Sequence, residues 1–248
     1  MRETPPAPGP AAPGVLAPAT TFPGRHALRE QEAVWCEFLL MGQSVVDSLE
    51  KSVTALRDGR VDLVPEVKEL ERSSDREEVR IEQSCLRVLA LFEPVASDLR
   101  RMATILKVSR DWERIADLAA RIARRARKLV RGYGGAVTVP DSLKALGSEV
   151  LDQTRGSYEA LAGRDSARAR ALIGGDHAID RGYRRFRREM KDSLRHDPEQ
   201  LDAWLQLLSI GRHLERIADH AAGIAETVVY LEEGIIIRHE SETPAAED

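Results

Sequence analysis

The chain has 248 residues, of which 42% are hydrophobic and 31% are charged, so it is long enough to bury a sizeable core. Its 37 basic and 41 acidic residues give a formal net charge of -4, which argues against a protein that binds nucleic acid or an anionic membrane through bulk charge. Aromatic residues make up only 4%, a content that favours an α-helical protein over a β-sandwich.

The two ends of the chain differ in composition from the rest. Residues 1–26 are rich in Pro, Ala and Gly and lack the apolar stretch of a signal peptide, which predicts a disordered arm. Residues 239–248 are expected to form a short acidic tail. No stretch approaches the roughly 18 apolar residues of a membrane-spanning helix. We therefore expect a cytoplasmic protein that reaches a membrane only indirectly, through a partner.

The first half predicts three helical regions, divided by Gly59 and Pro94. The first covers residues 26–57, and the second is interrupted near Pro65 and at residues 73–74 before it ends at residue 92. In the third, apolar residues recur at steps of three and four over residues 105–126, the pattern of a helix packed in a bundle.

The second half repeats this organisation. WERIADLAARIA at 112–123 returns as LERIADHAAGIA at 214–225, and the offset is constant, because 215 minus 113 and 219 minus 117 are both 102. This repeat indicates an internal duplication. Between the copies, residues 131–143 contain three glycines and a proline, the composition of a linker.

Three helices are predicted for the second half as well. The first covers residues 142–162, the second breaks at residues 174–175 and continues to 195, and the third begins where Asp197 and Gln200 are placed for a capping box. The predicted fold is all-α, with two tandem three-helix bundles over residues 27–131 and 142–238, joined by a linker at 132–141. We expect each bundle to have a core of its own, not a shared one.

Each repeat carries two carboxylates one helical turn apart, Glu113 with Asp117 and Glu215 with Asp219. At about 100° per residue, both members of the first pair lie about 160° from Ile115, the centre of the apolar stripe. The pairs are therefore expected on open, solvent-exposed faces. Because like charges at this spacing cost a helix about 0.2 to 0.5 kcal/mol, each pair needs a compensating positive charge.

Two sources of that charge remain open. Arginines three positions away form candidate pairs in both halves, and Arg121 can bridge to Asp117, although Gly223 takes its place in the second copy. Alternatively, a metal ion is held by the carboxylate oxygens, with Asp75 or Asp180 from a neighbouring helix completing the site. The small residues beside the pairs, such as Ala116 and Ala120, would leave room for a ligand to approach.

The chain resembles the PhoU family. The resemblance rests on EPVASDLRRMATILKVSRDWERIADLAARIA from residue 93, on LDAWLQLLSIGRHLERIADHAAGIAETVVYLEEGIIIRH from residue 201, and on their joint occurrence. It implies a metal-binding protein, and the family's acidic motifs fall on Glu113 with Asp117 and on Glu215 with Asp219. Iron, zinc, manganese or magnesium is the expected metal.

The resemblance also implies a function and partners. PhoU-like proteins are negative regulators of phosphate uptake and of phosphate-starvation signalling. The expected partners are the nucleotide-binding subunit of the phosphate ABC transporter, a phosphate-sensing histidine kinase and a second copy in a homodimer. The alternative is a PhoU-like metal-binding accessory protein of another phosphate or metal transporter.

The histidines and cysteines predict no catalytic site. A di-iron oxidase requires Glu-x-x-His, and none of the six histidines has a glutamate three positions before it. His213 and His220 are the only histidines near an acidic pair, and His213 is expected on the surface. Cys36 and Cys85 have no C-x-x-C partner, and both are expected to be reduced, buried thiols. We therefore expect the protein not to be an enzyme.

Overall fold

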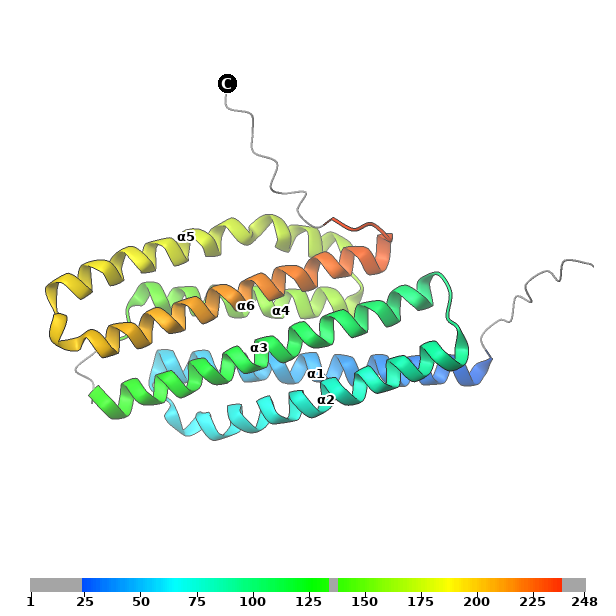
Figure 1. The fold of residues 1–248 in the computed structure, drawn as a ribbon. Helices are drawn as coiled ribbons and strands as arrows, with labels where there is room; N and C mark the ends of the chain where they lie inside the picture. The colour runs from blue at the N-terminus through cyan, green and yellow to red at the C-terminus, as the bar shows by residue number, and fades with distance from the viewer. Residues whose placement is uncertain (1–23, 134–137, 238–248) are drawn as a thin grey trace, which may run out of the picture.

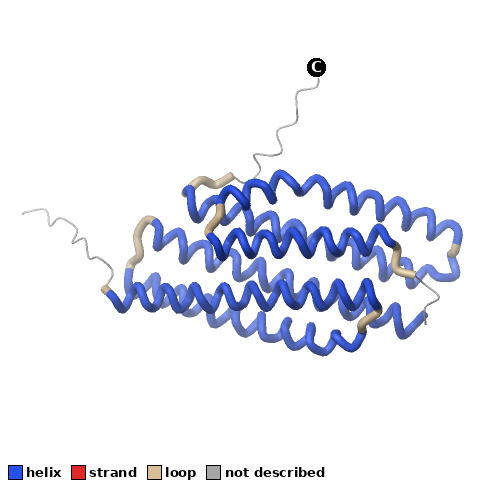
Figure 2. Tube along the Cα trace, turned by 180° about the vertical axis from the view of Figure 1, so that it is seen from behind, coloured by secondary structure: helices blue, strands red, loops and turns tan. Residues whose placement is uncertain are grey.

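The computed structural model describes residues 24–133 and 138–237. Within these ranges the regular structure is entirely helical, which confirms the all-α prediction. The elements are α1 (Arg25–Asp58), η1 (Val61–Leu63), α2 (Val64–Phe92), α3 (Ser97–Tyr133), α4 (Asp141–Gly163), α5 (Ser166–His196), η2 (Pro198–Gln200) and α6 (Leu201–Glu233). The predicted arm up to residue 23, residues 134–137 of the predicted linker and the predicted acidic tail lie outside the described residues (Figure 2).

The six long helices form two layers of three. In one layer α1, α2 and α3 pack against one another, and in the other α4, α5 and α6 do the same (Figure 1). The layers meet where α3 lies along α6 and α1 lies beside α4, which leaves α2 and α5 on the two outer sides. α3 and α6 run in opposite directions, so residues early in one lie beside residues late in the other.

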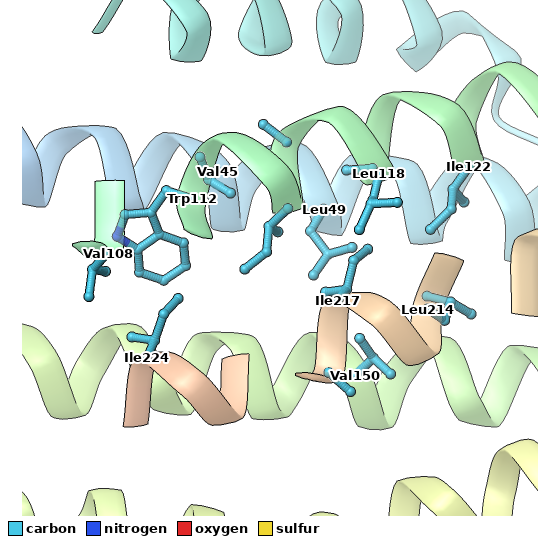
Figure 3. Packing of buried hydrophobic residues seen from close by; sticks show 14 of the residues in the cluster. Val45, Leu49, Val108, Trp112, Leu118, Ile122, Val150, Leu214, Ile217 and Ile224 are labelled. Carbon is cyan, nitrogen blue, oxygen red and sulfur yellow. The ribbon is translucent and has the colours of Figure 1, made fainter. Parts of the chain in front are cut away.

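The two layers share one continuous hydrophobic core, so the prediction of two separate cores is wrong. Figure 3 shows side chains of α1 and α3 meeting those of α4 and α6, among them Leu49, Trp112 and Ile217. The physical reason lies in the alanines of the repeat. Ala116 and Ala218, at equivalent positions outside the predicted apolar stripe, are 1% and 2% exposed and belong to this core, so they widen the buried surface of both helices.

Several predicted helix breaks do not occur. Pro65 lies in the first turn of α2, where its missing amide hydrogen costs nothing. Residues 73–74 lie inside α2, and residues 174–175 lie inside α5, because packing along a long helix outweighs the helix propensity of two glycines. The stop at Gly59 is confirmed, with a φ of 67° that glycine adopts without strain.

The predicted capping box at the start of the last helix is also wrong. The chain enters α6 through the 3-10 turn η2, and Gln200 precedes the helix without a side-chain cap hydrogen bond. Instead, the backbone carbonyl oxygen of Asp197 accepts a hydrogen bond from the indole Nε1 of Trp204 at 3.1 Å.

Among the described helices, none combines the length and the apolar character needed to cross a bilayer.

Close packing of the second bundle provides a stability test. A Cβ at Gly211 of α6 would lie 2.3 Å from Cε1 and 2.8 Å from Cδ1 of Phe186, a fully buried ring of α5. We expect Gly211→Ala to lower the free energy of unfolding by about 1–3 kcal/mol, because the ring has no free space to move into. Urea unfolding followed by circular dichroism measures the change.

The matched control is Gly223→Ala in the same helix, where no atom lies within 4 Å of the added Cβ. This substitution should leave the protein unchanged or stabilise it by up to about 1 kcal/mol, since alanine is the better helix former. Equal stability of the two variants would contradict the tight α5–α6 packing.

Candidate metal centre

The first acidic pair lies on the flank of α3 that faces α2, and it is not on an open face. The side chains of Glu113 and Asp117 are only 17% and 22% exposed. The prediction of a solvent-exposed pair is therefore wrong for this half. α3 packs against α1, α2 and α6 at once, so little of its circumference remains open, including the side opposite Ile115.

The small residues beside this pair do not leave room for a ligand, as the sequence suggested. Ala116 and Ala120 are buried, and Ala120 packs with Ala123 against Val64 and Val67 at the start of α2. The alanines let α2 approach α3 closely. The same close approach brings acidic side chains of α2 near the pair.

Burial raises the pKa of Glu113 above its ordinary value of 4.5. The negative charges of Glu78, Asp117 and Asp75 raise it further, and Arg114 opposes the shift. The folded state therefore binds this proton more tightly than the unfolded state does. Protonated Glu113 therefore stabilises the folded state fully below pH 4.5, and this stabilisation is lost as the pH rises through the folded-state pKa. At neutral pH the ionised carboxylate of Glu113 costs stability.

The second pair is arranged similarly between α6 and α5. Burial raises the pKa of Glu215, and the charges of Asp219 and Asp180 add to this, while Arg212 and Arg187 oppose it. Asp219 is exposed, as expected, and Glu215 is half-buried. Asp75 and Asp180, named from the sequence as neighbouring carboxylates, thus lie close enough to influence the first and second pair, respectively.

Glu78 is the acidic neighbour that the sequence interpretation missed. It lies one helical turn after Asp75 on α2, and it raises the pKa of Glu113 more than Asp75 does. The i,i+3 spacing of the two acids on α2 is a signal that could have found it, because residues three apart share a helix face.

Arginines already hold part of the first pair. Nε of Arg121 donates to both carboxylate oxygens of Asp117 at 3.0 Å, as anticipated from the spacing. Nε of Arg114 lies 3.3 Å from Oε2 of Glu113, its neighbour in sequence, although it was expected to pair with Asp117. In the second half Gly223 stands at the position equivalent to Arg121.

The donor types fit a hard cation, whereas the arrangement of donors is incomplete. Carboxylate oxygens suit Mg, Mn and Fe, and the pKa values of Glu113 and Glu215 are raised by burial first and by neighbouring carboxylates second. Across residues 24–133 and 138–237, however, no three His, Cys, Asp or Glu side chains converge as a ligand set. A metal would have to displace Arg121 from Asp117 and draw in a carboxylate of α2.

His213 and His220 lie in the seam between α3 and α6. Nδ1 of His220 lies 3.0 Å from Oδ1 of Asp111, a contact that joins the two halves. His213 is half-buried, and both of its ring nitrogens are buried without a hydrogen-bond partner in the described part of the chain. The expected surface position of His213 is therefore wrong.

The internal duplication explains this difference between the two histidines. The offset of 102 makes His213 equivalent to Asp111 and His220 equivalent to Leu118. The pair equivalent to Asp111 and His220 is therefore His213 and Leu118. At the position equivalent to Leu118 the second half has His220, which meets the carboxylate of Asp111, whereas Leu118 offers His213 no hydrogen-bonding group. Burial first, and then Arg125, Arg121 and Arg216, lower the pKa of His213 to about 4, which keeps its ring neutral at neutral pH.

The two cysteines have different environments. Cys85 is buried, as expected, and burial together with the charge of Glu82 raises the pKa of its thiol to about 12. Cys36 is exposed on α1, which corrects the expectation that both thiols are buried. It lies on the turn before the exposed Leu40, on a part of α1 that no other helix covers.

Comparison with known proteins assigns both halves to the same domain type. The PhoU domain model matches residues 38–126 and 143–228, one match in each layer. The phosphate-specific transport system accessory protein PhoU homolog of Pseudomonas putida is 35% identical over 216 residues, which cover 85% of this chain and 82% of that protein. The accessory protein PhoU of Escherichia coli is 29% identical over 210 residues, with 85% and 86% covered.

Solved structures give the same result. The crystal structure of PhoU from Pseudomonas aeruginosa has a TM-score of 0.80 at 34% identity and covers 84% of this chain and 99% of that one. The phosphate transport system regulatory protein PhoU from Streptococcus pneumoniae has a TM-score of 0.76 at 28% identity, with 85% and 98% covered. The chain therefore belongs to the PhoU family.

Proposed function

We propose that the protein is an accessory protein of a phosphate-specific transport system and a negative regulator of phosphate uptake and phosphate-starvation signalling. The observation that carries this proposal is the 35% identity to accessory proteins of that system over 85% of the chain. In this role it works in the cytoplasm as a non-enzymatic adaptor, and it contacts the nucleotide-binding subunit of the transporter and a sensor histidine kinase.

The architecture suits an adaptor. The α3–α6 seam joins two related acidic faces in one unit, one between α2 and α3 and the other between α5 and α6 (Figure 1). Two related faces on one molecule can engage two partners, or one partner and a second copy in a homodimer. A shared core keeps the faces at a fixed separation, since neither layer can move without exposing buried apolar surface.

We further propose that each acidic face binds a cation. Glu113 and Asp117 would hold it in the first half with Asp75 or Glu78, and Glu215 and Asp219 would hold it in the second half with Asp180. The support is the raised pKa of both glutamates, because a cation would remove the electrostatic cost of ionising them.

A double substitution tests the first metal site. The variant with Glu113→Gln and Asp117→Asn should be at least as stable as the wild type at pH 7 without metal, since it removes a carboxylate whose pKa folding raises. With added Fe, Mn, Mg or Zn, the melting temperature should rise more for the wild type than for this variant, which keeps only the second acidic face, because a ligand that binds the folded state stabilises it. Thermal melts and elemental analysis measure both effects.

The control removes two carboxylates from open surface. Asp152 and Asp192 are 76% and 67% exposed and each lies near one arginine, so Asp152→Asn with Asp192→Asn should keep the metal-dependent rise. Identical metal responses in the wild type and in the Glu113 and Asp117 variant would leave the arginine-balanced surface as the correct interpretation.

A deletion strain tests the regulatory role. Without the protein, expression of phosphate-starvation genes should become constitutive, because the kinase is no longer restrained when phosphate is plentiful. A reporter gene under a starvation-induced promoter, measured at high phosphate, gives the result. Normal repression in the deletion strain would refute the regulatory assignment.

Neutralising all four carboxylates separates the acidic faces from the rest of the protein. Glu113→Gln, Asp117→Asn, Glu215→Gln and Asp219→Asn together should reproduce part of the deletion phenotype while the protein remains folded and abundant. Complementation by the Asp152 and Asp192 variant is the control. Full repression by the folded quadruple variant would refute only the role of the acidic pairs.

A further inference from the structure

A basic groove lies where α3 ends and α6 begins. It has a volume of about 760 Å³ and is open to solvent. Its lining comes from the last two turns of α3 and the first two turns of α6: Arg127, Lys128, Arg131, Gly132, Tyr133, Asp202 and Gln206. The volume falls within the range of about 300–1,000 Å³ typical of small-molecule sites.

Three cations in this groove lack anionic partners. Among the described residues, Arg127, Lys128 and Arg131 form no ion pair within 4.0 Å. The neighbouring arginines of α3 are occupied, since Arg124 contacts Glu71 and Arg125 donates to Oε1 of Gln206. The sequence contains no Asp or Glu from residue 118 to residue 140, although the whole chain has a net charge of -4. Positive charge is thus concentrated locally against the overall balance.

The helix dipole of α3 accounts for only part of this pattern. Cations in the last turn of a helix gain about 0.3–1 kcal/mol, and the effect falls off beyond that turn. Arg131 lies in the last turn. Arg127 and Lys128 lie further inside the helix, and the dipole gives no reason for them to line a concave surface with Tyr133.

The first two turns of α6 form the opposite wall. Gln206 offers an amide, and Asp202 places one carboxylate in the lining. The groove therefore combines three cations, an aromatic ring and a single acid.

We propose that this groove binds a chain of linked phosphate groups, as carried by a nucleoside di- or triphosphate. Arg127 and Arg131 are four residues apart and span about 6 Å along the helix, which suits consecutive phosphates better than a single one. Arginine forks donate to phosphate oxygens in pairs. Tyr133 provides a ring against which a base can stack. The inference is independent of the regulatory function proposed above.

Titration calorimetry of the full chain at an ionic strength of about 0.15 M, where charges more than about 8 Å apart are largely screened, tests the site. Three ligands are compared without added metal: adenosine triphosphate, tripolyphosphate and orthophosphate. Arg127→Gln, Lys128→Gln and Arg131→Gln together should weaken binding of the first two ligands by more than about tenfold, since this variant loses the charge-assisted hydrogen bonds to phosphate oxygens. Orthophosphate should bind weakly to every variant.

The matched control removes three exposed arginines from α5. Arg181→Gln, Arg185→Gln and Arg188→Gln change the net charge equally at residues outside the groove. This variant should bind within about twofold of the wild type, because distant exposed charges are screened. Equal weakening in both triple variants, or no binding by the wild type, would overturn the proposal.

Two single substitutions define the ligand. Asp202→Asn should tighten binding, because it removes the one negative charge in the lining, and weaker binding in this variant would count against the proposed position of the phosphates. A preference for the nucleotide over tripolyphosphate that disappears in Tyr133→Leu would identify a nucleotide as the natural source. Equal affinity for the two ligands, unaffected by Tyr133→Leu, would identify an inorganic polyphosphate anion instead.

Discussion

The packing of α3 against α6 is the constraint on which the rest of the structure depends. Both helices carry the repeated motif, and their buried alanines let two long helices approach closely around Ile115 and Ile217. The neighbouring elements leave equally little space: a Cβ at Gly42 of α1 would lie 3.1 Å from Nε1 of Trp112 in α3. Because this seam fixes the middle of both helices, it also fixes the flanks that carry the acidic pairs.

That constraint places charge where it costs stability. α2 and α5 cover the flanks of the seam helices, so Glu113 and Glu215 are partly withdrawn from water and face further carboxylates. Binding surfaces typically retain unneutralised charge at a cost in stability. A cation or a basic partner surface that binds there forms charge interactions that water does not supply, and these interactions contribute to affinity.

The sequence predicts the helices well and their neighbours poorly. Periodicity and the 102-residue offset give six helices and the duplication, since both depend on local pattern. Contacts with a second helix determine the shared core, the partial burial of Glu113 and the buried ring nitrogens of His213. The azimuth of a residue within its own helix carries no information about those contacts. The two glycines at 174–175 fail as a break for the same reason, because tertiary contacts along α5 compensate for a local preference.

The two halves have kept their carboxylates and changed what surrounds them. Arg121 binds Asp117 in the first half, and Gly223 stands at the equivalent position in the second. Asp111 engages His220 across the seam, whereas His213, at the position equivalent to Asp111, is a half-buried neutral ring. The residues beside the acidic pairs therefore differ between the halves, while the pairs themselves are present in both. The two faces offer the same carboxylates in different surroundings, so they differ in the charge and shape that they present to a ligand.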